Sequence, residues 1–296
     1  MIDYPLARAV ALVVETGSFE RAARVLNITP SAVSQRVRQL EERLGAVLIE
    51  RGTPCRATEK GAWICRHVEQ VGLLEHELLR HLPGLIGAEG QRVTLNIATN
   101  ADSLGTWFLP AVAPFTAETG YLLNIGIDDQ DHTADWLRSG RVLAAVTGLE
   151  TPVQGCRIQR LGSLRYHATA SPDFIARHFP DGITAAAMAS APALTYDQKD
   201  RLQQRWLEMH LGQGVASPTH WLPSTQGFVD ATLVGMGWAL NPAMLVQEAL
   251  DRGLLVELIP GAVLDVPLYW QVNRLAAERL GPLTRSIVMA ARHALV

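Results

Sequence analysis

Residues 18–38, SFERAARVLNITPSAVSQRVR, constrain the fold of this chain more than any other segment. Ser18 precedes one apolar run, and Thr29-Pro30 precedes another. Both are typical helix starts, because a hydroxyl caps the first free N–H groups and proline fits the first turn. Asn27 tolerates the left-handed backbone that ends a helix. The segment therefore predicts two short helices joined by a turn.

The second helix is expected to have one buried and one exposed face. Its apolar residues are spaced by four, three and four positions, which predicts a buried stripe of Val33, Val37, Leu40 and Leu44. Ala22 and Ala23 in the first helix are small enough to let the two helices cross closely. The side chains left outside the stripe are Ser31, Ser34, Gln35, Arg36 and Arg38.

These outer side chains suit the major groove of DNA. Serine and glutamine bond base edges, and arginine bonds guanine or a phosphate. Residues 18–38 carry a net charge of +3 in a chain of net charge −3, so the positive charge is local. The segment therefore predicts a DNA-reading helix-turn-helix. The alternative is a solvated pair of surface helices.

A β-hairpin wing is predicted beside the second helix, at residues 46–58, which contain Gly, Thr and Pro. Arg51 and Arg56 lie there, and a wing presents such residues to phosphates or to the minor groove. The alternative is that these arginines serve solubility alone. The full set of expected DNA contacts is Ser18, Thr29, Pro30, Ser31, Ser34, Gln35, Arg36, Arg38, Arg51 and Arg56.

A first helix is expected at 3–16, and a long helix runs from Glu59 to about Leu82. Its apolar residues recur at spacings of three and four: Ile64, Val68, Val71, Leu74, Leu78 and Leu82. A helix of this length cannot bury that stripe within one small domain, so we expect it to pair with a second copy. Pro83 and the glycines up to Gly90 then form a hinge.

The rest of the chain alternates strands with helices. Strands are predicted at 93–99, 122–127 and 142–148, with helices between them, which indicates a parallel doubly wound α/β sheet. A second unit begins near Leu161, and a strand at 266–272 returns to the first. The expected domains are a winged helix-turn-helix at 1–58, a linker helix and hinge at 59–90, and a two-lobed effector domain at 91–296, with lobe I at 91–161 and 268–296 and lobe II at 162–267.

A small molecule is expected in the cleft between these lobes. Ligands of open α/β sheets bind at the carboxyl ends of strands and at helix N-termini. Hydroxyls and free N–H groups there suit a carboxylate, and aspartates suit an ammonium or guanidinium group. Capping of helices is the alternative role for the same residue types. The candidates are Asn100, Asp102, Ser103, Asp128, Asp129, Thr147, Asp197, Ser224 and Thr225.

Other classes of protein are disfavoured. The sequence contains no G-x-S-x-G, H-E-x-x-H, Walker or C-x-x-C motif, so we expect no enzyme, no catalytic residue, no cofactor and no metal. No apolar run reaches the ~18 residues of a membrane span, and no signal peptide is recognisable, which predicts a cytoplasmic protein. Residues 1–60 have a net charge of +2 and residues 61–296 of −5, as suits a DNA end and a sensing end.

The run AARVLNITPSAVSQRVRQLEERLG, residues 22–45, resembles the signature of LysR-type transcriptional regulators. The following stretch VLIERGTPCRATEKG departs from the usual L-F-x-R continuation of that family. It resembles the arginine- and lysine-responsive branch, the ArgP/LysG (IciA) type, as do NADSLGTWFLP from Asn100 and LGSLRY from Leu161. The resemblance therefore extends through most of the chain.

The resemblance implies a winged helix-turn-helix, a linker helix that forms a homodimer or homotetramer, and a two-lobed domain like the periplasmic binding proteins. It also implies transcription regulation at an operator with an inverted repeat, with RNA polymerase as a partner if the protein activates. The implied effector is L-lysine or L-arginine, and the implied targets are genes for basic amino acid export or metabolism. The alternatives are a different effector (an organic or aromatic acid), an architectural DNA binder without effector response, or a binding protein whose head contacts protein.

Overall fold

The computed structural model describes residues 2–81, 93–128 and 133–296. By its internal contacts the chain divides into two compact units, the first comprising residues 1–97, 120–124 and 135–143, and the second residues 98–119, 125–134 and 144–296. Leu82, the expected hinge at 83–90 and Asp129 lie outside the described residues. Within the described residues, no helix is both long and apolar enough to cross a membrane.

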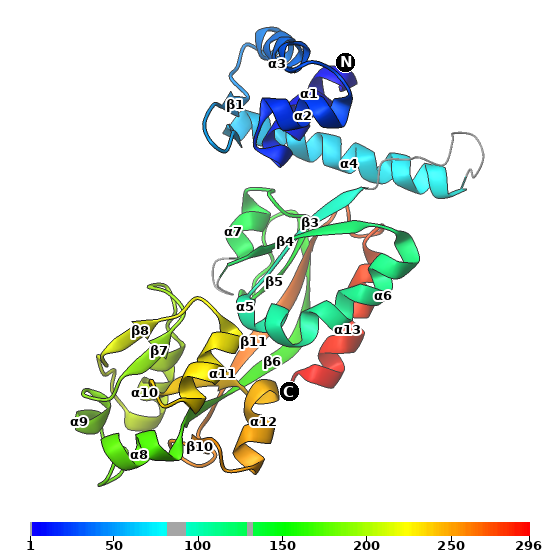
Figure 1. Ribbon diagram of the computed structural model, residues 1–296. Helices are drawn as coiled ribbons and strands as arrows, with labels where there is room; N and C mark the ends of the chain where they lie inside the picture. The colour runs from blue at the N-terminus through cyan, green and yellow to red at the C-terminus, as the bar shows by residue number, and fades with distance from the viewer. Residues whose placement is uncertain (1, 82–92, 129–132) are drawn as a thin grey trace. The chain divides into compact units, whose positions relative to one another are not determined.

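Three short helices pack together at the start of the first unit: α1 (Tyr4–Thr16), α2 (Phe19–Leu26) and α3 (Pro30–Leu44) (Figure 1). The Ser18 hydroxyl accepts the N–H of Arg21 at 3.4 Å, and the Thr29 hydroxyl accepts the N–H of Ala32 at 3.2 Å. Asn27 adopts the left-handed conformation with φ 53° and ends α2. The predicted caps are therefore confirmed.

The core of these helices follows the predicted stripe except at its end. Ala22, Ala23, Val33 and Val37 are almost completely buried, in one cluster with apolar residues of α1. Leu44, however, is 47 % exposed, so its predicted burial was wrong. Leu44 is the last residue of α3, which ends at a left-handed Gly45.

The predicted wing is present as a short hairpin. Strand β1 (Ile49–Glu50) pairs antiparallel with β2 (Arg56–Ala57). The N–H of Cys55 donates to the carbonyl of Gly17 at 2.9 Å, and the Ile49 side chain is buried, so the hairpin is fixed against the helices at both places. The peptide bond between Thr53 and Pro54 is cis.

The long helix α4 (Glu59–His81) is half covered. Ile64 and Val68 pack into the cluster that α1 builds, whereas Leu74 is 48 % exposed and Leu78 is 57 % exposed. The predicted stripe is thus buried at its start and exposed toward its end within a single chain.

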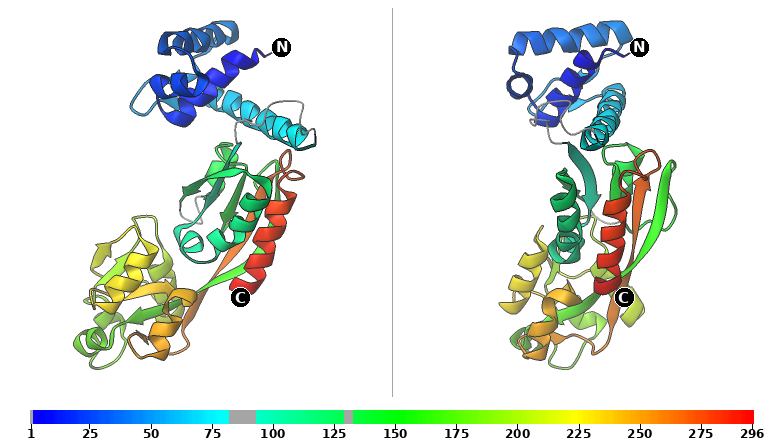
Figure 2. Two further views of the ribbon diagram at one scale, coloured as in Figure 1. Left: turned by 45° about the vertical axis from the view of Figure 1, so that its right-hand side comes forward. Right: turned by 90° about the vertical axis from the view of Figure 1, so that its right-hand side faces the viewer.

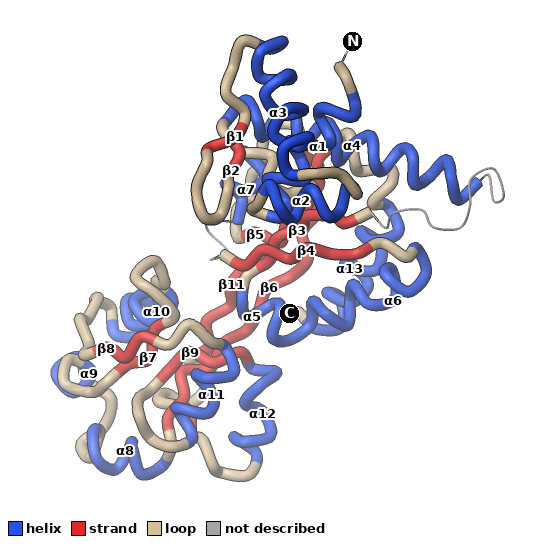
Figure 3. The backbone as a smooth tube through the Cα atoms, turned by 45° about the horizontal axis from the view of Figure 1, so that its top comes forward, coloured by secondary structure: helices blue, strands red, loops and turns tan. Residues whose placement is uncertain are grey.

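The remainder is built on a seven-stranded sheet with the order β10-β6-β11-β5-β3-β4, to which β9 pairs through β6 (Figure 3). The sheet is mixed, because β11 runs antiparallel to both β5 and β6. The parallel arrangement was predicted for the strands at 93–99, 122–127 and 142–148, and the antiparallel course of β11 was not anticipated. The strands are β3 (Thr94–Thr99), β4 (Leu122–Ile127), β5 (Ala144–Thr147), β6 (Cys156–Ala170), β9 (Ala239–Pro242), β10 (Val256–Glu257) and β11 (Val263–Asn273).

Two long strands, β6 and β11, connect a first and a second lobe. In the first lobe α6 lies beside α13, where the Ser286 hydroxyl donates to the Ala111 carbonyl at 2.6 Å (Figure 2). The helices of this lobe are α5 (Ala101–Ser103), the π-helical turn η1 (Leu104–Phe108), α6 (Leu109–Thr119), α7 (Thr133–Arg138) and α13 (Gly281–Ala294).

The second lobe is centred on a parallel pair of strands, β7 (Ala193–Thr195) and β8 (Thr219–Trp221). Trp206 is fully buried there and donates its indole N–H to the carbonyl of Ala262 at 2.7 Å. The helices of this lobe are α8 (Pro172–His178), α9 (Ala185–Met188), α10 (Leu202–Leu211), α11 (Thr225–Leu233) and α12 (Ala243–Asp251).

Candidate nucleic-acid interface and ligand site

The outer face of α3 presents the polar side chains that the sequence predicted. Ser31, Gln35 and Arg38 are exposed at spacings of four and three, which places them on one side of the helix. Ser34 and Arg36 are half-buried at its margins. Arg38 already has a partner, since its Nε donates to Glu42 Oε1 at 2.9 Å.

Two of the expected DNA contacts also serve the helices themselves. Ser18 caps α2 and donates its hydroxyl to Glu20 at 2.6 Å, a bond that lowers the pKa of that carboxyl. Thr29 caps α3 and shares a hydrogen bond of 2.9 Å with Ser31. Their hydroxyls therefore have bonding partners in the protein, whereas Pro30 presents an exposed ring at the start of α3.

The wing places two arginines in solvent. Arg51 lies with its guanidinium 5.3 Å from the centre of the Phe19 ring, a cation–π contact that limits where this side chain points. Arg56 is exposed on β2.

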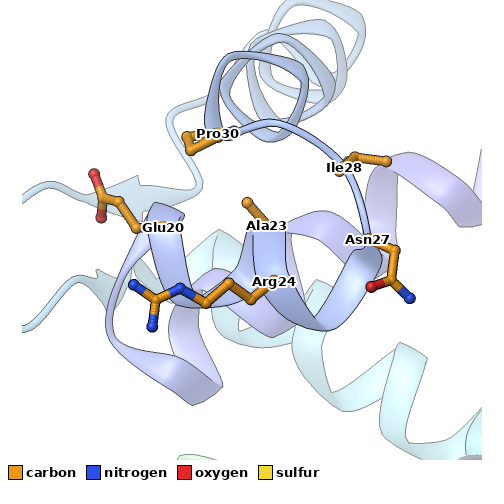
Figure 4. Close-up of a pocket in the computed structure, with 6 residues that line it drawn as sticks. All are labelled: Glu20, Ala23, Arg24, Asn27, Ile28 and Pro30. Atoms are coloured by element: carbon orange, nitrogen blue, oxygen red, sulfur yellow. The ribbon is translucent and has the colours of Figure 1, made fainter.

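An open depression also marks the outer side of the helix pair (Figure 4). It was not anticipated from the sequence, although Arg24 contributed to the charge count there. Arg24 and Asn27 are exposed on its α2 side. Its lining residues are Glu20, Ala23, Arg24, Asn27, Ile28 and Pro30.

The expected ligand site begins where β3 ends. Asn100 follows the strand and caps α5, because its side-chain oxygen accepts the N–H of Ser103 at 3.3 Å. The hydroxyls of Thr99 and Ser103 are both buried and have no hydrogen-bond partner among the described residues. Such groups are costly to bury unless something else bonds them. The helix predicted from Ser103 begins at Ala101 and passes through a π-helical turn, a feature common at functional sites.

Asp102 links this turn to the second lobe. One oxygen accepts the Thr225 hydroxyl at 2.6 Å, and the other accepts the Tyr166 hydroxyl at 2.7 Å. Burial raises the pKa of Asp102, and the two hydroxyl bonds partly oppose that effect. Tyr166 was not among the predicted site residues, although it ends the LGSLRY segment whose resemblance was noted.

Asp128 lies next to Thr99 at the end of β4. Its N–H donates to the Thr99 carbonyl at 3.4 Å, and its side chain accepts the Lys199 ammonium at 3.4 Å. Lys199 comes from the loop between β7 and α10 in the second lobe. The structure thus brings Asp102 and Asp128 to the same edge of the sheet, each with a partner from the second lobe.

The remaining candidates are occupied by local structure. Asp197 accepts the N–H groups of Lys199 and Asp200 at 2.7 and 3.1 Å, so it shapes its own turn. Thr147 accepts the N–H of Leu149 at 3.1 Å, and Ser224 caps α11 by accepting the N–H of Gly227 at 3.0 Å. Ser224 thus caps a helix, whereas Asp197 and Thr147 bond backbone N–H groups within their own turns.

Asp200 is a further acid that sequence reasoning missed. It accepts the N–H of Leu202 at 2.9 Å and of Tyr196 at 3.1 Å, and burial raises the pKa of its carboxyl. Asp200 lies three residues after Asp197 and so follows the same predicted strand, but the sequence did not show which of the two carboxylates faces inward.

Two family models match this chain. Residues 6–62 match the bacterial regulatory helix-turn-helix proteins of the lysR family, and residues 88–295 match the LysR substrate binding domain. Proteins of this family are transcriptional regulators that bind DNA and a small molecule and form oligomers; they are not enzymes.

Named relatives align over nearly their whole length. The transcriptional regulator ArgP of Pseudomonas aeruginosa is 46 % identical over 296 residues, which are 100 % of this chain and 98 % of that protein. The crystal structure of ArgP from Mycobacterium tuberculosis is 41 % identical and superposes with a TM-score of 0.81 over 100 % of this chain and 99 % of that one.

A third relative is LysG of Corynebacterium glutamicum, whose full-length structure holds the effector Arg. It is 35 % identical, with a TM-score of 0.71 over 99 % of each chain. With matching models for the DNA-reading and ligand-binding parts and these full-length relatives, the chain belongs to the LysR family of bacterial transcriptional regulators.

Proposed function

We propose that this LysR-type regulator senses a basic amino acid, L-arginine or L-lysine, and controls genes for the export or metabolism of such amino acids. One observation supports the choice of site: the buried hydroxyls of Thr99 and Ser103, which have no hydrogen-bond partner in the described part of the chain, lie near the carboxylates of Asp102 and Asp128. A zwitterion with a cationic side chain needs both kinds of group. The arginine held by the LysG relative supports the choice of effector.

The hydroxyls suit the α-carboxylate of the effector. Thr99 ends a strand and Ser103 lies in the first turn of the helix that follows it, which is where open α/β sheets bind anions. Bonds from two hydroxyls to a carboxylate would offset the cost of their burial, since hydrogen bonds to charged groups contribute about 1.5–3 kcal/mol.

The carboxylates suit the cationic end. Asp128 is the more accessible of the two acids at this edge, with 22 % of its side chain exposed. Asp102 is enclosed by Tyr166 and Thr225, so an approaching cation would favour its ionised form against the burial that raises its pKa.

On DNA, the outer face of α3 would enter the major groove, and the wing would contact the phosphate backbone or the minor groove. Two copies would read an inverted repeat whose half-sites lie about one helical turn, ~10 bp, or a multiple apart. The proposed domains are a DNA-binding domain at 1–58, a dimer-forming linker at 59–90 and an effector domain at 91–296. A regulator that reads DNA acts in the cytoplasm, and an activator would contact RNA polymerase.

Calorimetry on the full-length protein tests the effector assignment. L-Arginine or L-lysine should give measurable heat, whereas L-norleucine, which has an uncharged side chain, should bind at least about tenfold more weakly, because a charge-assisted bond is lost. Ser103→Ala and Asp128→Asn should each weaken arginine binding by a similar factor. Asp230→Asn, which removes an exposed carboxylate from α11, is the matched control and should bind as the wild type does.

Two results would contradict the assignment of the effector. Heat with an organic or aromatic acid and none with arginine or lysine would replace the effector. Equal affinity for arginine and norleucine would remove the acids from the site.

A further inference from the structure

The Lys199–Asp128 pair has a consequence for the effector. We propose that Lys199 is a tethered competitor: its ammonium occupies Asp128 when the site is empty, and the cationic side chain of the effector must displace it. This inference rests on the proposed function, because it concerns the carboxylate assigned above to the effector's cation.

The contact joins the two lobes at that carboxylate. Lys199 Nζ lies 3.4 Å from Asp128 Oδ1, with Asp128 at the end of β4 and Lys199 in the loop that precedes α10. The lysine side chain is 51 % exposed, so it has room to swing away into solvent. An ammonium at this place carries the same charge as the side chain of a lysine or an arginine effector and lacks only the planar fork of the guanidinium.

The loop that carries Lys199 is held firmly while its side chain is not. Asp197 accepts the N–H groups of Lys199 and Asp200, and Asp200 accepts the N–H of Tyr196, so the backbone is bonded on both sides of the lysine. The anchored backbone keeps the ammonium within reach of Asp128, which gives it a high local concentration at that carboxylate.

The residue type also fits a displaceable cation. The chain has 26 basic residues, of which Lys60 and Lys199 are the two lysines. An arginine here would offer a planar fork that bonds a carboxylate through two parallel N–H groups, whereas lysine is a single-point cation on a flexible stem. The weaker partner is the one that an effector guanidinium can replace.

The exposure of the Lys199–Asp128 ion pair sets how strongly Lys199 can reduce effector affinity. Exposed ion pairs with long N···O distances are weak. The tethered ammonium should therefore reduce effector affinity modestly, and its removal should tighten arginine binding about two- to fivefold.

Two other roles for Lys199 predict different results. If the ammonium instead binds the effector's α-carboxylate, its removal weakens binding of arginine but not of agmatine, which has the guanidinium and lacks the carboxylate. If the pair instead holds the lobes closed around the ligand, its removal weakens the binding of both compounds.

The test is calorimetry with L-arginine and agmatine on the full-length wild type, Lys199→Gln and Arg201→Gln. Arg201 is an exposed cation two residues away whose Nη1 donates to Gln204 at 2.8 Å, so this variant controls for loss of one positive charge from the same loop. The competitor predicts about two- to fivefold tighter arginine binding by Lys199→Gln alone, with agmatine following wherever its affinity is measurable. In an Asp128→Asn background the Lys199→Gln change should then have no effect, because the partner is already gone.

Every outcome of this experiment either supports or overturns the competitor role of Lys199. Unchanged or weaker arginine binding by Lys199→Gln overturns the competitor, and the agmatine series assigns a weaker result to one of the two other roles. An equal gain in Arg201→Gln would also overturn it, as a general charge effect. If neither the wild type nor Lys199→Gln binds arginine or lysine, the proposed effector itself fails and the competitor fails with it; binding that Lys199→Gln leaves unchanged refutes the competitor alone.

Discussion

At the scale of single residues, the hydroxyls of the candidate sites fall into two groups: those with a hydrogen-bond partner and those without one among the described residues. Thr29 and Thr147 have the same chemistry as Thr99, but each accepts a backbone N–H of its own turn. The hydroxyls of Thr99 and Ser103 are buried and have no such partner among the described residues. Burial without a partner is therefore the property that separates the hydroxyls proposed to bind the ligand from those that bond their own turns.

Arg38 and Arg43 provide a matched test of how α3 docks on DNA. Both are exposed and both are ion-paired, Arg38 with Glu42 at 2.9 Å and Arg43 with Asp3 at 3.0 Å. Exposed pairs contribute little to folding, so alanine at either position should leave the fold intact. Arg38→Ala should weaken operator binding about tenfold and lower the salt slope by about 1, because one phosphate or base contact is lost.

Fluorescence anisotropy over a salt series measures both quantities. Arg43→Ala should match the wild type, since Arg43 lies in the last turn of α3, beside the start of α1. Equal losses in the two variants, or none in either, would contradict the docking of the outer face of α3 on DNA.

At the scale of elements, local signals could be predicted and non-local ones could not. The caps at Ser18 and Thr29 were predictable because the bonds that make them span three residues. The antiparallel course of β11 was not, because it depends on partners in β5 and β6 more than 90 residues earlier in the chain. The exposure of Leu44 depends on the tertiary packing around the end of α3, which its spacing within the helix does not encode.

The same contrast between local and non-local signals applies to the residues of the candidate site. The sequence placed Thr225 and Asp102 at the edge of the site through the strand and helix ends around them. It missed Tyr166 as their partner, because a tyrosine inside a strand gives no sign of what its hydroxyl contacts. Lys199 was equally hidden, since nothing near it in the sequence points to Asp128.

The exposed end of α4 predicts an oligomer interface. Leu74 and Leu78 are separated by one helical turn, and both apolar side chains are exposed in a single chain. Replacing both with Glu should convert the oligomer to a smaller species, because two like charges from each copy would face one another in an apolar seam. Sedimentation velocity measures the change, and Met209→Glu, at an exposed apolar residue of α10, should sediment as the wild type. An unaltered sedimentation coefficient in the Leu74→Glu, Leu78→Glu variant would place the interface elsewhere.

Glu69 on the same helix predicts a pH-dependent stability. Its Oε1 accepts the side-chain N–H of Asn96 at 2.8 Å and the backbone N–H at 3.3 Å. Burial raises the pKa of Glu69 from its ordinary 4.5 to about 7, and nearby Glu15 adds to the rise. The folded state therefore binds a proton between about pH 4.5 and pH 7 that the unfolded state releases. The free energy of unfolding falls as pH rises through that window and is not recovered above it.

Glu69→Gln should remove this dependence, because glutamine keeps the acceptor oxygen and carries no charge. Relative to the wild type, the variant should gain about 1–3 kcal/mol of stability at pH 8 over its difference at pH 5. Urea unfolding at both values measures it, with Glu118→Gln, an exposed carboxylate at the end of α6, as the control. A constant difference between variant and wild type across the range would show that Glu69 is ionised in the folded protein at pH 5.

At the scale of the whole molecule, charge and chemistry are segregated along the chain. Residues 1–60 have a net charge of +2 and contain the face proposed to read DNA, whereas residues 61–296 have a net charge of −5 and contain the acids of the proposed ligand site. The acidic body is repelled from DNA and favours orientations in which the basic end approaches it. Under the proposed function, the same negative charge that repels phosphate would attract a cationic amino acid.

A regulator built in this way must obey linkage between its two ligands. If arginine changes operator affinity by some factor, operator must change arginine affinity by the same factor, because both describe one coupling free energy of typically about 1–3 kcal/mol, or about 5–150-fold. Anisotropy with and without saturating arginine gives the first factor, and calorimetry with and without saturating operator gives the second. Asp128→Asn should weaken the response to arginine at fixed concentration and leave operator affinity without arginine unchanged. Identical operator affinity with and without arginine, in a protein that binds both, would mean that the ligand domain does not control the DNA-binding one, and the chain would then be an architectural DNA binder.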